Sequence, residues 1–194
     1  MMKFRSSPGR SVLMQGLMPE GNPQERRVTA CFTGHRFIAR EDRELLPVLL
    51  DEALEALYAK GITHFISGAA IGFDTLAARR VLALRDRYPE VRLQLAVPCA
   101  DQDARWQKSD VLARQTLLDA ADETVILSPQ YYDGCMQVRN QYMLGHASLV
   151  IAYLKHTRGG TMSTVAAAVR RELPVMNLLM KDGESSLDGV LCRL

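Results

Sequence analysis

The sequence predicts a single α/β domain of the doubly wound type, in which a mainly parallel sheet of about six strands carries helices on both faces. From residue 28 onward, short β-branched apolar runs alternate with longer segments of helical period, which is the pattern of consecutive βαβ units. A chain of 194 residues with a hydrophobic share of 47 % is long and apolar enough to fold around one core.

Six segments have the length and composition of buried strands, with turn residues on either side. They span residues 28–33, 62–67, 91–97, 123–128, 148–153 and 174–178. The segments between them place apolar side chains at helical spacing, and Gly61 supplies the left-handed stop that is typical of a helix C-terminus. The predicted helices occupy residues 41–61, 73–88, 101–121, 132–145 and 161–173.

The predicted domain covers residues 28–180, with a short segment on either side. Residues 1–27 contain charges and Pro/Gly breaks and lack the apolar run of a secretory signal, so we expect a flexible leader. Residues 181–194 are polar until their end, and we expect a tail or a short helix there. No segment approaches the roughly 20 apolar residues that span a bilayer, so we expect a cytoplasmic protein with no membrane contact.

Charge and cysteine content argue against several classes of function. The chain has 24 Lys and Arg against 22 Asp and Glu, so no global field concentrates polyanions, and a nucleic-acid partner is not expected. The four cysteines are widely spaced without a C-x-x-C pair, and the four histidines occur singly. This pattern is typical of a reduced protein without a metal site.

The first predicted strand ends in a turn that can approach a ligand closely. Right-handed crossovers bring the carboxyl ends of parallel strands to one edge of the sheet, and open α/β sheets bind their ligands there. Thr33, Gly34, His35 and Arg36 follow each other at this end, and the arginine can form a fork with a phosphate. An ordinary turn with solvated neighbours is the alternative.

The second predicted strand leads into a glycine-containing turn before a helix. Ser67, Gly68, Gly72 and Asp74 lie there, where free backbone N–H groups and the helix dipole favour an anion. The spacing matches neither G-x-G-x-x-G nor a Walker A loop, so neither an NAD fingerprint nor an ATPase is predicted. Asp74 either faces the ligand or is a favourable acid in the first helical turn.

The fifth predicted strand is followed by a second candidate phosphate-binding turn. Gly159 and Gly160 stand directly before a hydroxyl-rich helix start at Thr161. One such turn is a weak signal on its own, because short glycine turns follow many strands. Two of them at the same sheet edge favour a binding function.

Two further segments are candidates for ligand contacts. Gln102, Arg105 and Trp106, after the third strand, either bring a cation and an aromatic surface to a base or, in the case of Trp106, anchor a helix. Arg139 and Asn140, after the fourth strand, either contact the ligand or bridge subunits.

The segments TGHR, ISGAAIGFDTLAA, VRNQYML and RGGTMSTVAAA, in this order within residues 28–180, resemble the YpsA-like family of the SLOG superfamily. This Rossmann-like group includes the DNA-processing protein DprA and the Lonely Guy phosphoribohydrolases. The resemblance implies a Rossmann-like fold, a nucleotide-related ligand at the glycine turns and a homodimer. The residues it assigns to the ligand site are Gly34, Arg36, Ser67, Gly68, Gly72, Asp74, Gly159, Gly160 and Thr161.

One departure from the relatives bears on the activity. The Lonely Guy motif P-G-G-x-G-T-x-x-E ends in a glutamate taken as catalytic, and the matching segment from Arg158 onward lacks it. The missing carboxylate argues against the same N-glycosidic hydrolysis unless Asp74 supplies one.

Three functions follow from these features. The first is binding or sensing of a phosphate-bearing nucleotide or ADP-ribose-like small molecule, with Mg²⁺ only where the nucleotide carries it. The second is nucleotide N-glycoside hydrolysis, with Asp74 as the best catalytic candidate. The third is single-stranded DNA binding, as in DprA.

Overall fold

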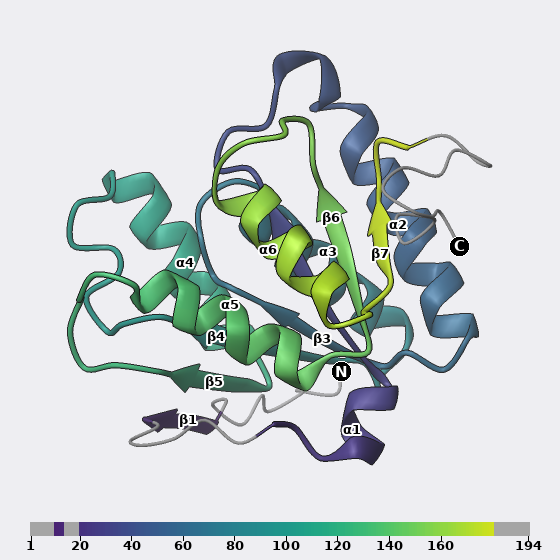
Figure 1. Cartoon of the computed structure of the whole chain (residues 1–194), viewed down its shortest axis with the longest axis horizontal. Coiled ribbons are helices and arrows are strands. Elements are labelled where there is room, and N and C mark those ends of the chain that lie inside the picture. Colours follow the sequence, from purple (N-terminus) through teal and green to yellow (C-terminus); the bar gives the residue numbers. More distant parts are fainter. Residues whose placement is uncertain (1–9, 14–19, 181–194) are drawn as a thin grey trace, which may run out of the picture.

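The structure, a computed structural model, describes residues 10–13 and 20–180 of the chain. Within these residues seven strands form one fully parallel sheet in the order β1-β5-β4-β3-β2-β6-β7 (Figure 1). The strands are β1 (Arg10–Leu13), β2 (Thr29–Gly34), β3 (His64–Ser67), β4 (Arg92–Val97), β5 (Glu123–Ile126), β6 (Leu149–Tyr153) and β7 (Val175–Asn177). The doubly wound, Rossmann-like α/β fold predicted from the sequence is confirmed.

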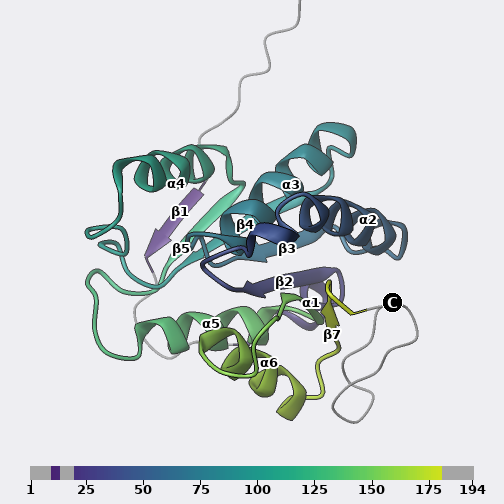
Figure 2. The same ribbon diagram turned by 90° about the horizontal axis from the view of Figure 1, so that it is seen from above.

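Six α-helices and one 3₁₀ turn connect these strands in the described ranges. They are α1 (Pro23–Arg27), the 3₁₀ turn η1 (Arg40–Asp42), α2 (Leu45–Ala59), α3 (Phe73–Arg87), α4 (Lys108–Ala120), α5 (Cys135–His146) and α6 (Gly160–Arg170). Figure 2 shows α2, α3 and α4 on one face of the sheet and α5 and α6 on the other. The helices therefore cover both faces, as the βαβ pattern predicts.

The strands divide their side chains between two cores. Ala30 and Phe32 of β2 point into the core beneath α2 and α3, whereas Cys31 between them packs with residues of α5 and α6. This alternation follows from the period of two along a strand. Because helices cover both faces, neither face of β2 meets water, and the strand is buried along nearly its whole length, its two threonines included.

The segment expected to be a flexible leader contributes two elements to the fold. Strand β1 pairs in parallel with β5, with Val12 opposite Val125, and adds a seventh strand to the six that were predicted. Helix α1 begins with Pro23 in its first turn and is capped by the Asn22 side chain, which accepts from the N–H of Gln24. A strand of four residues between charges and Pro/Gly breaks leaves too short a pattern to recognise. The expected tail at residues 181–194 lies outside the described residues.

Three helices begin later than predicted, and the first of them is α2, which starts at Leu45 after the 3₁₀ turn at Arg40–Asp42. Residues 101–107, assigned to a helix from the sequence, form successive turns in which Ala104 and Trp106 donate their N–H groups to Asp101 and Asp103, and α4 starts only at Lys108. Helix α5 starts at Cys135, after Gly134 in the left-handed conformation. The aspartates and the glycine favour turns locally, and this preference outweighs the helical spacing of the apolar residues.

The direction of winding reverses at β2. From β2 the chain moves outward through β3, β4 and β5, and it then returns to place β6 on the other side of β2. The carboxyl ends of β2 and β6 therefore flank a topological switch point, the place where open α/β sheets bind ligands. The turns after β4, β3, β2 and β6 lie on four adjacent parallel strands, and we call their surface the carboxyl edge.

An amide clamp fixes one of these turns. The Asn177 side chain accepts from the backbone N–H of Leu154 at 3.1 Å and donates to the backbone oxygen of the same residue at 3.1 Å. Asn177 ends β7 and is buried, and Leu154 is the first residue after β6. The clamp thus continues the pairing of β6 and β7 by one residue and sets the direction in which the chain leaves the sheet.

We expect Asn177→Ala to lower the free energy of unfolding by about 2 kcal/mol, because it leaves two backbone groups without partners. Urea denaturation measures the change, and Gln115→Ala on the exposed side of α4 is the control, expected to stay within about 0.5 kcal/mol. A loss for Asn177→Ala no larger than that of the control would show that water replaces the amide fully.

Candidate functional site

A buried ion pair crosses the carboxyl edge. Nη1 of Arg139, on α5, lies 3.3 Å from Oδ2 of Asp74, on α3, and both side chains are about nine-tenths buried. The two helices lie on opposite faces of the sheet, so the pair joins the faces over the ends of the strands (Figure 2). The sequence analysis singled out both residues, and the structure brings them together.

The Asp74 carboxylate is held by the turn that precedes its own helix. It accepts a backbone N–H from Ala70, and Ser67 donates its hydroxyl to the backbone oxygen of Asp74 at 3.0 Å. Burial raises the pKa of Asp74, and the charges of Arg139 and Arg36 together with the Ala70 bond oppose this rise. At least one backbone amide of the turn after β3 therefore donates to a carboxylate of the protein itself, that of Asp74.

Three glycines of the edge are required by close packing. A Cβ on Gly68 would lie 1.3 Å from Nη1 of Arg139, and one on Gly34 would lie 2.4 Å from the ring of Phe73. Gly72 has φ +85° and passes so close to the turn after β2 that its Cβ would lie 2.1 Å from the backbone oxygen of Arg36. These glycines let the turns after β2 and β3 and the arginine of α5 pack together.

The glycines at the start of α6 have open space around them, in contrast to Gly72 before α3, although neither helix has a side-chain cap among the described residues. Gly159 precedes α6 with φ +98°. A Cβ on Gly159 or Gly160 would meet nothing within 4 Å. The first amides of a helix lack intrahelical partners, and with the helix dipole they attract an anion.

His35 connects the turn after β2 with this open helix start. Its Nε2 accepts the backbone N–H of Lys155 at 3.0 Å, so the ring proton of the neutral imidazole is on Nδ1, 3.4 Å from the Thr161 hydroxyl oxygen. Burial and the nearby His156 lower the pKa of His35, which favours this neutral form. The imidazole thereby holds the turns after β2 and β6 at a fixed separation.

A second hydrogen-bonded cluster supports the turn after β2. The Tyr153 hydroxyl, at the end of β6, donates to Asp42 at 2.7 Å and accepts from the backbone N–H of Ala39 at 3.1 Å. Lys155 reaches Asp42 at 2.9 Å and Glu41 at 2.5 Å. Sequence reasoning missed this cluster, and its only signal is a tyrosine at the end of an otherwise aliphatic strand.

Unpaired positive charge remains at the edge. Arg36 and Arg158 are exposed and make no ion pair with the described residues, and each stands beside one of the turns that His35 connects. Phe37, next to Arg36, is 88 % exposed. The edge thus offers two free guanidinium groups and one solvated aromatic ring near the open start of α6.

The remaining predicted residues lie around this centre. Asn140 donates its side-chain amide to the Thr164 hydroxyl at 2.8 Å and so ties α5 to α6. Arg105 is exposed and Trp106 half-buried in the turns that follow β4. The charge of Asp133 raises the pKa of Tyr131, and the nearby Arg105 opposes this rise. Thr33 is buried at the end of β2.

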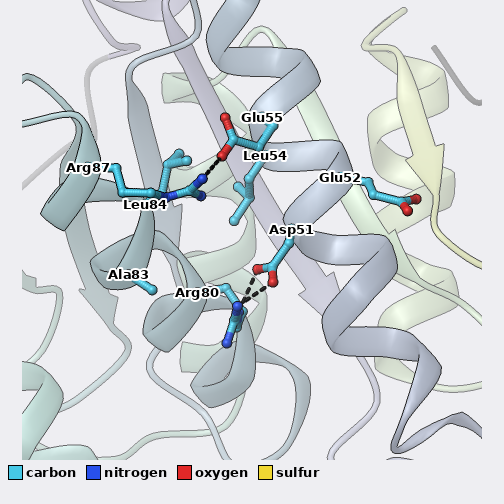
Figure 3. A pocket seen from close by; sticks show the side chains of 8 residues that line it. All are labelled: Asp51, Glu52, Leu54, Glu55, Arg80, Ala83, Leu84 and Arg87. Carbon is cyan, nitrogen blue, oxygen red and sulfur yellow. Dashed lines mark hydrogen bonds and ion pairs between the residues drawn. The ribbon is translucent and has the colours of Figure 1, made fainter.

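A groove between α2 and α3 is set apart from these residues (Figure 3). It has a volume of about 530 Å³, and its arginines are engaged by its own carboxylates, Arg80 with Asp51 and Arg87 with Glu55. This pairing leaves little positive charge free to bind an anion in the groove.

In the described ranges no three His, Cys, Asp or Glu side chains gather as a metal site would require. None of the described helices is both long and apolar enough to cross a membrane.

Fold and edge together define a Rossmann-like domain with an open helix start at its switch point. The sequence matches the YspA SLOG family over residues 38–175, more than half of the chain. The protein therefore belongs to the YspA SLOG family.

Curated relatives are bacterial. The SPbeta prophage-derived protein YoqJ of Bacillus subtilis is 26 % identical over 122 residues, which cover 57 % of this chain and 71 % of YoqJ. A UPF0398 protein of Halalkalibacterium halodurans is 24 % identical over 125 residues, which cover 63 % of this chain and 66 % of that protein.

Two solved structures share the fold. DNA processing protein A from Helicobacter pylori, in a structure concerned with its single-stranded DNA binding mode, superposes with a TM-score of 0.56 at 20 % identity, over 86 % of this chain and 73 % of that one. DprA from Streptococcus pneumoniae gives 0.57 at 18 % identity, and the match spans 88 % of this chain but only 56 % of that one.

The buried ion pair gives a prediction that a double-mutant cycle can check. We expect Gly68→Ala to lower the free energy of unfolding by about 3 kcal/mol, because the new methyl group collides with Arg139. In an Arg139→Ala background the same substitution should cost about half as much, since only the contact with Asp74 remains. Urea denaturation of the four proteins measures the coupling, and equal costs in both backgrounds would contradict the packing described.

Proposed function

We propose that the protein binds a phosphate-bearing, nucleotide-type small molecule at the carboxyl edge, with the phosphate at the first turn of α6. The observation that carries the proposal is the open helix start, with free space around Gly159 and Gly160 and no capping side chain among the described residues. The turn after β3 is the weaker candidate for the phosphate, because the Asp74 carboxylate already accepts one of its amides.

The charges around α6 support the same position. Arg158 precedes the glycine pair, and His35 brings the turn that carries Arg36 next to Thr161. Two guanidinium groups that have no ion-pair partner among the described residues can therefore reach a phosphate bound at these amides. Hydrolysis of an N-glycosidic bond is less well supported, because Asp74 is buried and occupied by Arg139.

We expect Gly160→Val to abolish binding of ribose 5-phosphate and AMP while the fold stays intact. The valine side chain has room in the free protein and would occupy the space assigned to the phosphate. The thermal shift that each compound causes measures binding, because a ligand of the native state raises the apparent stability.

Ser163→Val is the matched control, because this exposed residue lies in the same helix and its N–H is already bonded to Gly159 at 3.0 Å. The control should bind as the wild type does. Wild-type affinity in Gly160→Val would place the phosphate elsewhere, and the absence of any shift in the wild type with either compound would refute the proposed function.

Single-stranded nucleic acid is the second candidate ligand. The observation in its favour is Phe37, an aromatic ring that is 88 % exposed beside the free Arg36, since such pairs form stacking platforms for successive bases. The H. pylori relative is described as a single-stranded DNA binder, and its likeness to this chain concerns the fold.

Fluorescence anisotropy of a labelled oligothymidylate tests this second function. If the edge binds single strands, Phe37→Ala should weaken binding about tenfold, and Leu112→Ala, an exposed apolar side chain on α4, should leave it unchanged. Equal affinities for both variants, or affinity that does not fall with added salt, would argue against a stacking platform on this edge.

A further inference from the structure

The side chain of a buried glutamine at the carboxyl edge has no hydrogen-bond partner among the described residues. Gln102 is 8 % exposed, and neither Oε1 nor Nε2 of its side chain is bonded within the described part of the chain. The amide can donate two hydrogen bonds and accept two, and a buried polar group without partners is destabilising. Buried polar atoms of native proteins nearly always have a partner, so an unmet amide at this position points to a partner from outside.

The fold places Gln102 beside the site already described. Its backbone N–H donates to Cys99 at 3.2 Å, in the turn that leaves β4 at the carboxyl edge. The thiol of Cys99 contacts that of Cys135, the first residue of α5, and Arg139 follows one helical turn later. Nε of Arg139 is also buried without a partner among the described residues. The two unmet polar groups thus lie on segments that meet where Cys99 approaches Cys135.

The chemistry of the amide indicates what it recognises. A glutamine side chain presents a donor next to an acceptor in one plane, which matches a planar group that presents an acceptor next to a donor. Adenine does so with N7 and its 6-amino group, and glutamine is one of the side chains that bind this pair with two hydrogen bonds. An inorganic phosphate or a ribose phosphate, which offers mainly acceptors, would leave the carbonyl oxygen of the amide poorly matched.

We propose that Gln102 reads the nucleobase of the ligand, through paired hydrogen bonds to an edge of the adenine type. This inference rests on the proposed function, because the phosphate at α6 brings the nucleotide to the edge. The first turn of α6 then supplies the affinity that all phosphorylated ligands share, and Gln102 distinguishes among their bases.

The test is Gln102→Leu, which keeps a similar volume and removes both unmet polar atoms. In the absence of ligand we expect a higher melting temperature, since an unpartnered buried amide is replaced by an apolar side chain. We expect AMP affinity to fall at least about fivefold, in line with the loss of a good bidentate base contact, and affinity for ribose 5-phosphate to stay the same. Gln107→Leu, an exposed glutamine just before α4, is the control and should change neither quantity.

A nucleotide with an altered base tests whether Gln102 recognises the 6-amino group of adenine. Purine riboside 5′-monophosphate lacks the 6-amino group, so the wild type should prefer AMP to it, and Gln102→Leu should bind both equally. If Gln102→Leu still binds ribose 5-phosphate and its AMP affinity is unchanged, or if its melting temperature is lower, the role of Gln102 is overturned while the proposed function stands. Failure of the wild type to bind either AMP or ribose 5-phosphate would instead overturn the proposed function on which it rests.

Discussion

The ion pair between Arg139 and Asp74 organises the carboxyl edge. It joins helices that lie on opposite faces of the sheet, and it does so above the strand ends, where no strand separates them. Removing one partner would leave a buried charge unpaired, which typically costs about 3–5 kcal/mol, so the two helices and the turn at Gly68 hold one another in place. The Cys31 thiol lies near the pair, and burial, aided by the charge of Asp74, raises its pKa to about 12. It therefore stays a protonated core group.

The pair also makes the two glycine turns different, because it occupies the turn after β3 and not the start of α6. In the turn after β3, Asp74 accepts one backbone amide and pairs with Arg139, whereas the first turn of α6 has no such side chain of the described residues against it. Sequence reasoning assigned both turns to an external phosphate, since a glycine before a helix looks alike in either situation. The two situations are distinguished only in the structure, by the burial of Asp74 and by the ion pair that Arg139 forms with it.

Much of the fold is visible in the sequence because strands β2 to β7 are largely buried and the long helices carry apolar stripes. The exceptions are local: β1 has four residues and no measurable period, and the turns before α4 carry apolar residues at helical spacing. The site is less predictable. Arg139 and Asp74 are 65 positions apart and the Tyr153 hydroxyl bonds a residue 111 positions away, so neither contact leaves a pattern along the chain. The missing partners of Gln102 are a property of its three-dimensional surroundings.

The uncapped start of α6 has a consequence for how the protein moves. Without a capping side chain, the first turn of this helix is held by the His35 contact to Thr161 and by the Thr164 hydroxyl, which donates to the backbone oxygen of Gly160 and accepts from Asn140. Uncapped helix ends fray and exchange their amide hydrogens through local opening. An anion on these amides would supply the missing cap and raise the cost of that opening. Ligand occupancy would then be recorded as slower hydrogen exchange of the backbone amides in the first turn of α6.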